Sequence, residues 1–270
     1  MEEIINLLNY VFIQRALICG IAISICAALI GVILVLKNYS MIGHGLGEVG
    51  FAALTLAVAL GLPPLAISLP LVMGAAIIIM IISQKKGESG DIIIALVSTG
   101  ALAAGIIITS VSTGFNIDVA NYMFGSILSM TKSDVIISIV LSIFVIFVYM
   151  FFYNRLFMVT YDEKFAKTRG INVTFYHFLI AFLTALIVVL GMRMMGTLLI
   201  SSLIVFPAVI AKGLTHSFKQ LILASGIISV TCFILGMIIS FFLNLPTGAS
   251  IAAVYILLLI ITRIVSKFCR

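Results

Sequence analysis

Residues 11–36 read VFIQRALICGIAISICAALIGVILVL, and this stretch decides the class of fold. Arg15 is its only charged side chain, and the stretch exceeds the roughly 20 residues of helix that cross a bilayer. The whole chain is 63% hydrophobic and only 9% charged, with a mean hydropathy of +1.36. Soluble domains carry about a quarter of charged residues. The sequence therefore predicts an all-α, polytopic helical membrane protein.

Apolar runs and helix-breaking residues divide the chain into about eight to nine candidate spans. We expect these spans near residues 11–36, 44–61, 63–84, 91–111, 134–154, 174–192, 195–212, 220–243 and 247–264. No segment is polar enough for a second soluble domain, so residues 1–270 are expected to form one transmembrane domain. The amphipathic stretch 112–131, which contains Asp118, predicts an interfacial or re-entrant helix. Whether Asp118 joins a transport path is left open.

The basic residues predict an orientation and not a nucleic-acid partner. The net charge is +6 and the isoelectric point is near 9.2. With the N-terminus outside, most of the 15 lysines and arginines fall in inner loops, as the positive-inside rule requires. The four cysteines form no CxxC motif, so we interpret them as small hydrophobic residues.

The segment Gly43-His44-Gly45-Leu46-Gly47-Glu48 places an imidazole and a carboxylate four residues apart in an apolar setting. Residues i and i+4 share one face of a helix, and a carboxylate at helix centre in a bilayer costs about 2.5–3.5 kcal/mol. The pair suits a divalent transition metal. The alternative is a buried polar pair whose members only satisfy each other.

One connection, residues 155–172, is both long and polar. Within it, residues 161–170 predict a short helix with Asp162 and Glu163 at its start, Arg169 near its end and Gly170 as its stop. It is either an interfacial linker or a cytoplasmic docking surface with Phe165 and Ala166 as the apolar contact. The chain has no GxxxxGK[ST] motif, so nucleotide chemistry must come from another chain.

Five blocks in this order resemble the permease subunits of zinc/manganese/iron ABC importers, which are similar in topology to cobalamin and iron-siderophore permeases. They are residues 38–48 (NYSMIGHGLGE), 122–128 (YMFGSIL), 165–171 (FAKTRGI), 195–208 (MGTLLISSLIVFPA) and 245–250 (LPTGAS). The resemblance covers nearly the whole chain and implies a type II ABC importer-like membrane domain.

The resemblance has one departure at the polar pair. The family usually has aspartate where this chain has His44, and histidine where it has Glu48. The spacing and the two kinds of donor are kept while their order is exchanged. The resemblance therefore implies that His44 and Glu48 contact the metal, but it does not imply which metal.

The resemblance also implies roles for other residues. ATPase coupling is assigned to residues 155–172, with Asp162, Glu163, Phe165, Ala166, Arg169 and Gly170. Ser201, Ser202 and Pro207 would line a pathway, although Pro207, which removes the hydrogen bond to the Leu203 carbonyl, also explains a simple bend. Pro246, Thr247 and Gly248 would contact an extracytoplasmic binding protein, or form only a tight connection. His177 and His216 are interpreted as plain interfacial histidines.

The leading hypothesis is the membrane subunit of an ATP-driven importer of divalent metal, zinc or manganese, in the plasma membrane of a prokaryote. Its implied partners are a second copy of the chain, a cytoplasmic ATPase and an extracytoplasmic metal-binding protein. The metal is the substrate, and no permanent cofactor is expected. The alternative is a stand-alone proton-coupled secondary transporter in which Glu48 titrates. A membrane enzyme would need a cluster of catalytic groups, and three histidines with nine acids form none in the sequence.

Overall fold

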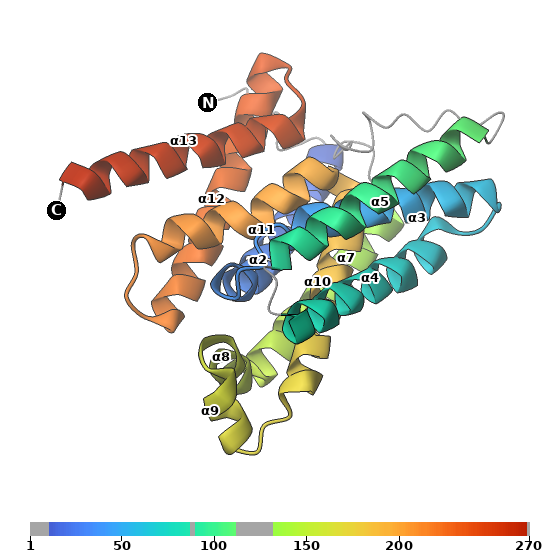
Figure 1. The fold of residues 1–270 in the computed structure, drawn as a ribbon. Helices are drawn as coiled ribbons and strands as arrows, with labels where there is room; N and C mark the ends of the chain where they lie inside the picture. Colours follow the sequence, from blue (N-terminus) through green and yellow to red (C-terminus); the bar gives the residue numbers. More distant parts are fainter. Residues whose placement is uncertain (1–10, 87–89, 112–131, 269–270) are drawn as a thin grey trace.

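The computed structural model describes residues 11–86, 90–111 and 132–268, and the regular elements in these ranges are all helices. In chain order they are α2 (Val11–Leu36), α3 (Ile42–Ala59), α4 (Pro64–Lys86), α5 (Gly90–Val111), α7 (Lys132–Phe151), α8 (Tyr153–Tyr161), α9 (Glu163–Thr168), α10 (Val173–Met195), α11 (Thr197–Lys212), α12 (Phe218–Leu243) and α13 (Thr247–Phe268). Figure 1 shows the long helices in one bundle, with α8 and α9 projecting beyond it at one end. The all-α prediction is confirmed.

Each predicted span is helical, but not every one is long enough to cross a bilayer. By length and composition α2, α3, α5, α10, α12 and α13 qualify, and α7 qualifies only together with α8, from which a bend of 70° separates it. The helix α11 (Thr197–Lys212) is shorter than the roughly 20 residues that a span needs, and so is the apolar stretch Ala66–Ile82 within the longer helix α4. The described residues therefore hold six candidate spans, or seven with the bent pair, against the eight to nine that we expected.

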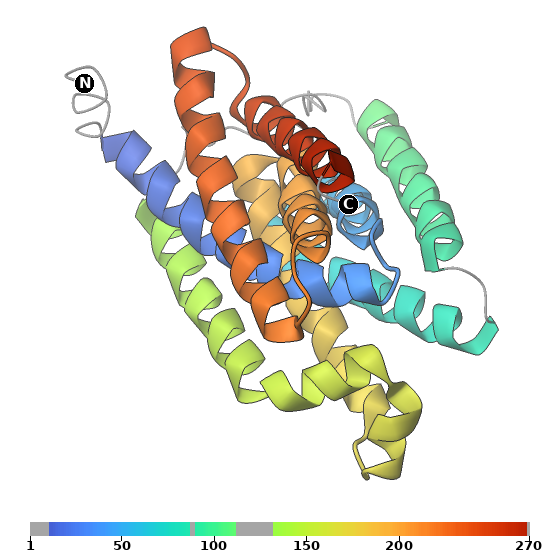
Figure 2. The same ribbon diagram turned by 90° about the vertical axis from the view of Figure 1, so that its left-hand side faces the viewer.

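The centre of the bundle is α2, which packs against α7, α10, α11 and α12 (Figure 2). In the most apolar 18-residue stretch of α2, 78% of the residues are buried, and in the corresponding stretch of α10 the buried share is 72%. The corresponding shares are 22% in α5 and α13 and 28% in α12. The outer faces of these three helices are thus left to lipid or to other chains.

Glycines let α11 approach α2 and α3 closely. A β-carbon at Gly31 of α2 would overlap the backbone carbonyl oxygen of Ile204 in α11. On α3, a β-carbon at Gly43 would lie 3.0 Å from Cδ1 of Ile204, and one at Gly47 would lie 3.1 Å from Cγ2 of Thr197. Small residues at a helix interface let the two backbones approach closely in this way. This packing fixes α3 against α11 at the level of the polar pair.

Aromatic rings hold α8 against the start of α12. The ring of Phe218 lies 5.7 Å from that of Tyr153, 5.0 Å from that of Phe157 and 5.8 Å from that of Tyr161, centroid to centroid. Such contacts add about 0.5–1.5 kcal/mol per pair beyond the buried area. We expect residues 153–161 to end a span and begin a loop, but they form a separate, packed helix.

The predicted re-entrant helix at 112–131, the block at residues 122–128 and Asp118 lie outside the residues that the structure describes.

Candidate functional site

The polar pair lies on α3 between two packed faces. Successive residues of a helix are about 100° apart, so Gly43 and Gly47 face one way and Gly45 another. Gly43 and Gly47 face α11, whereas a β-carbon at Gly45 would lie 2.5 Å from Cγ2 of Ile94 in α5. His44 and Glu48 therefore occupy the strip of α3 between α11 and α5, which neither helix covers.

The two donors point toward each other. Nε2 of His44 lies 3.3 Å from Oε1 of Glu48, and the side chains are 46% and 19% exposed. The shared helical face predicted from the i, i+4 spacing is therefore observed. Both readings of the pair survive this geometry, because the same separation suits a hydrogen bond and two ligands that approach one ion.

In the described part of the chain, no third histidine, cysteine or acidic side chain joins the pair. Among the described residues no group of three or more His, Cys, Asp or Glu side chains is placed to hold a metal ion. A structural zinc site has four protein ligands. The two side chains alone therefore do not make a closed structural metal site.

The predicted pathway residues of α11 lie beside this strip. A β-carbon at Gly43 would lie 3.6 Å from Cα of Ser201. The hydroxyls of Ser201 and Ser202 both donate to the carbonyl oxygen of Leu198, at 2.9 Å each. Ser201 is partly exposed, whereas Ser202 and Pro207 are buried. Of the three predicted pathway residues, Ser201 is therefore the one with exposed surface.

The predicted cytoplasmic helix exists as α9 with the expected ends. The Asp162 carboxylate accepts a hydrogen bond from the backbone N–H of Phe165 at 2.9 Å, which caps the first turn. Gly170 has φ +74° and donates its N–H to the Lys167 carbonyl oxygen at 3.0 Å. The left-handed conformation favours glycine and closes the helix.

The apolar side of α9 does not face outward as a whole. Ala166 is fully buried inside this chain, whereas Phe165 is 47% exposed and lies under the Arg169 guanidinium, 5.2 Å from the ring centroid. Of the two predicted apolar contacts, only Phe165 is thus accessible to a partner. A charge at Ala166 would disturb the packing of this chain itself.

Sequence reasoning missed a polar cluster at the base of α9. Nζ of Lys37 lies 2.5 Å from Oε1 of Glu163 and 2.8 Å from Nε2 of His177. Nε2 of His177 in turn lies 3.0 Å from Oε1 of Glu163. His177 is therefore no plain interfacial histidine. The available signals were a lysine at the end of a long apolar run and an acid at the start of the polar helix.

Burial and the charges of the cluster shift the pKa values of Lys37 and Glu163, which lie outside the spans. Burial lowers the pKa of the Lys37 ammonium, and the Glu163 carboxylate offsets this in part. For Glu163, partial burial acts to raise the pKa, but hydrogen bonding and charge attraction from Lys37, together with His177, outweigh it and lower the pKa. The charged form of Glu163 is thus stabilised in the folded chain, whereas burial costs the Lys37 ammonium more than the attraction of Glu163 returns.

The predicted outer contact lies at the turn between α12 and α13. Asn244 adopts the left-handed conformation with φ +52° and ends α12, and α13 starts at Thr247. Pro246 is exposed, Thr247 is partly exposed and Gly248 is buried. A partner on this side would reach Pro246 and Thr247 and not Gly248.

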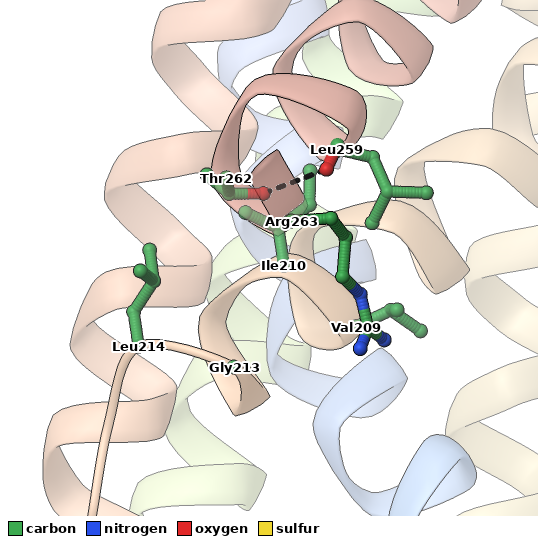
Figure 3. A pocket seen from close by; sticks show the side chains of 7 residues that line it. All are labelled: Val209, Ile210, Gly213, Leu214, Leu259, Thr262 and Arg263. Atoms are coloured by element: carbon green, nitrogen blue, oxygen red, sulfur yellow. Dashed lines mark hydrogen bonds between the residues drawn. The ribbon is translucent and has the colours of Figure 1, made fainter. Parts of the chain in front are cut away.

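A separate cavity of about 160 Å³ lies between the ends of α11 and α13 (Figure 3). Figure 3 shows the Arg263 side chain extending from α13 toward Val209 of α11. The remaining lining residues are Ile210, Gly213, Leu214, Leu259 and Thr262. His44 and Glu48 are not among the residues that line it, so the cavity is not the predicted metal contact.

Fold and site together define a class: a polytopic helical membrane protein with a histidine–glutamate pair on one helix of its bundle and a capped polar helix at one end. A family model described as the ABC 3 transport family matches residues 9–266. The chain belongs to this family. It is accordingly a multi-pass membrane permease of the ATP-binding-cassette importer type, and ATP hydrolysis resides in a separate subunit.

Individual relatives match over nearly their full lengths. The manganese import system permease protein ScaB of Streptococcus gordonii is 30% identical, over 97% of this chain and 94% of its own. The high-affinity zinc uptake system membrane protein ZnuB of Buchnera aphidicola is 28% identical, over 87% and 90%. Among solved structures, PsaBC from Streptococcus pneumoniae in complex with Fab superposes with a TM-score of 0.85 at 30% identity, covering 97% of this chain and 94% of the other.

Proposed function

We propose that this permease imports a divalent transition metal, manganese or zinc, and that His44 and Glu48 contact the ion on its way. The observation that carries the proposal is the 3.3 Å donor pair on the uncovered strip of α3. Ionisable residues within membrane helices face the bundle interior or water and mark substrate paths. The similarity to a manganese permease and to a zinc permease supports both ions as candidates.

Two donors make the contact transient. An ion in a path must bind well enough to enter and weakly enough to leave, and an incomplete ligand set meets both needs. Imidazole suits zinc and carboxylate suits manganese, so the mixed pair accepts either. Ser201, beside the strip on α11, lines the next part of the path.

The partners follow from the exposed elements. A homodimer would enclose the exposed strip of α3 away from lipid. A cytoplasmic ATPase would contact α9 through Phe165 and Arg169, with Asp162 and Gly170 fixing the two ends of the helix. An extracytoplasmic metal-binding protein would reach Pro246 and Thr247. In this proposal the whole chain, residues 1–270, is a single permease domain.

Substitution of the pair tests the metal contact. Glu48→Gln keeps the size of the side chain and removes its charge, and His44→Ala removes the imidazole. Uptake of radioactive manganese and of zinc should fall by about tenfold or more in both variants, as when metal-site groups are lost elsewhere. The amount of protein in the membrane should stay unchanged.

Asp91→Asn is the matched control, because Asp91 is an exposed carboxylate in the first turn of α5, a helix that also borders the strip. This variant should transport normally. Wild-type uptake by both Glu48→Gln and His44→Ala would leave the pair a structural one.

A further inference from the structure

Three elements that are distant in sequence meet at the cluster of Lys37, Glu163 and His177. Lys37 directly follows α2, Glu163 is the first residue of α9, and His177 lies in the second turn of α10. The three contacting atoms are Nζ of Lys37, Oε1 of Glu163 and Nε2 of His177, and they lie 2.5–3.0 Å from one another. The contact thus ties the short polar helix directly to two of the most buried helices of the bundle.

Hydrogen-bond chemistry makes Glu163 the centre of this cluster. An ammonium only donates and a carboxylate only accepts, whereas a neutral imidazole nitrogen does one or the other. If Nε2 carries a proton, His177 and Lys37 both donate to Glu163. If it carries none, Lys37 donates to both partners. Glu163 accepts a hydrogen bond from Lys37 in either tautomer of His177, so the connection between α9 and the bundle does not depend on the tautomer.

The cluster is shielded on the side of the bundle. The side chains of Lys37 and His177 are each 6% exposed, whereas that of Glu163 is 41% exposed. Charges in such a place interact more strongly than on an open surface, because water and salt screen them less. Removing one partner also leaves the other buried without its counter-charge.

Besides the cluster, α9 packs on α8 and α10, but it buries little of its own surface. The helix has six residues, and Ala166 is its only buried residue. Residues 163 and 166 are one turn apart and share a face. The inner face of α9 is therefore held at two points, one apolar and one charged, while Lys164, Phe165 and Lys167 are exposed on the rest of the helix.

We propose that Lys37, Glu163 and His177 are positioning residues that make α9 move as one body with α2 and α10. This inference rests on the proposed function of α9 as the contact of the ATPase. From α2 and α10 a displacement continues into α11 and α3, because both helices pack on α11, and α10 also packs on α3. These are the helices that carry Ser201 and the His44–Glu48 pair. Without the cluster, α9 would yield to the ATPase while the bundle stays in place.

The test is the number of manganese ions imported per ATP hydrolysed, measured in proteoliposomes that contain the permease, its ATPase and its binding protein. Glu163→Gln, Lys37→Met and His177→Gln should assemble with the ATPase and hydrolyse ATP. Their ratio of ions to ATP should fall by about tenfold, within the range of coupling between distant sites. The double variant Lys37→Glu/Glu163→Lys, which restores the opposite charges, should recover most of the ratio. Asp91→Asn serves as the control.

Two results would overturn the inference. One is a wild-type ratio of ions to ATP in both Glu163→Gln and Lys37→Met. The other is a loss of transport in proportion to the loss of folded, assembled complex, with no rescue by the Lys37→Glu/Glu163→Lys variant. A purely structural role of the cluster would produce this second result. Failure of the proposed function itself looks different, because the unmodified permease would then import manganese without the ATPase or fail to assemble with it.

Discussion

His44 and Glu48 stand on α3 in the opposite order to the one that the resemblance to the family implies. The geometry is compatible with either order in the proposed metal contact. The two groups point toward each other at 3.3 Å, so an ion between them meets one nitrogen and one carboxylate oxygen in either order.

Exchanging the two donors therefore preserves the site. The double variant His44→Asp/Glu48→His should retain manganese uptake within about tenfold of wild type, since the donor set of the pair is the same. His44→Asp alone leaves two carboxylates and should lower zinc uptake more than manganese uptake. Parallel uptake assays with both ions measure this. A double variant as inactive as Glu48→Gln would show that the position of each donor matters more than its chemistry.

Glu163 predicts a dependence of stability on pH. Its pKa in the folded chain lies below the ordinary 4.5, so it stabilises the folded chain above that value, and this contribution is lost as the pH falls through the lowered pKa. In detergent, the thermal midpoint of wild type should drop more below about pH 4.5 than that of Glu163→Gln. Equal drops in the two proteins would mean that the ion pair with Lys37 contributes nothing.

Local spacing predicted the His44–Glu48 pair, because i and i+4 meet on any helix. It could not predict the Lys37–Glu163–His177 cluster, whose members come from three elements that only the tertiary fold brings together. The same limit applies to Ala166. An apolar residue on a polar helix indicates a contact, but the sequence does not say whether the contact lies within the chain or with a partner.

Among the helices, the close approach of α2 and α11 is the packing most sensitive to substitution. Gly31→Ala would drive a β-carbon into the carbonyl oxygen of Ile204, and backbone cannot rotate away as a side chain can. We expect a destabilisation of about 1–3 kcal/mol, as for other overpacked cores. It would be seen as a lower thermal midpoint of the purified permease.

Gly226→Ala is the control for this prediction, because no atom lies within 4 Å of the added β-carbon on α12. Alanine favours a helix over glycine by about 1 kcal/mol, so this variant should be as stable as wild type or more so. A Gly31→Ala variant of equal stability would show that α2 and α11 move apart without penalty.

Hydropathy located the long helices well, including α2 at residues 11–36 and the start of α13 at Thr247. It was less informative about α8, where rings around Phe218 fold a segment that looks like the end of a span. It also did not show that α11, with 16 residues, is shorter than a full span. Packing inside the bundle, and not length alone, determines where such helices lie.

For the molecule as a whole, composition and the order of motifs indicated the membrane class and the family, and the family match over residues 9–266 confirmed both. Composition and motif order could not give the packing of the helices around the His44–Glu48 pair. This arrangement depends on glycine contacts that bring α11 against α2 and α3, and on the uncovered strip that remains between α11 and α5. Only the assembled bundle shows that His44 and Glu48 lie on that strip.

The energy source of transport tests the whole proposal most directly. Sealed proteoliposomes containing the permease, its ATPase and its binding protein should import manganese or zinc only with hydrolysable ATP, and import should persist after an uncoupler collapses the proton gradient. The matched preparation lacks only the ATPase and should not transport. Metal import by the permease alone, abolished by the uncoupler and indifferent to ATP, would contradict the ATP-driven mechanism and support a carrier driven by protonation of Glu48.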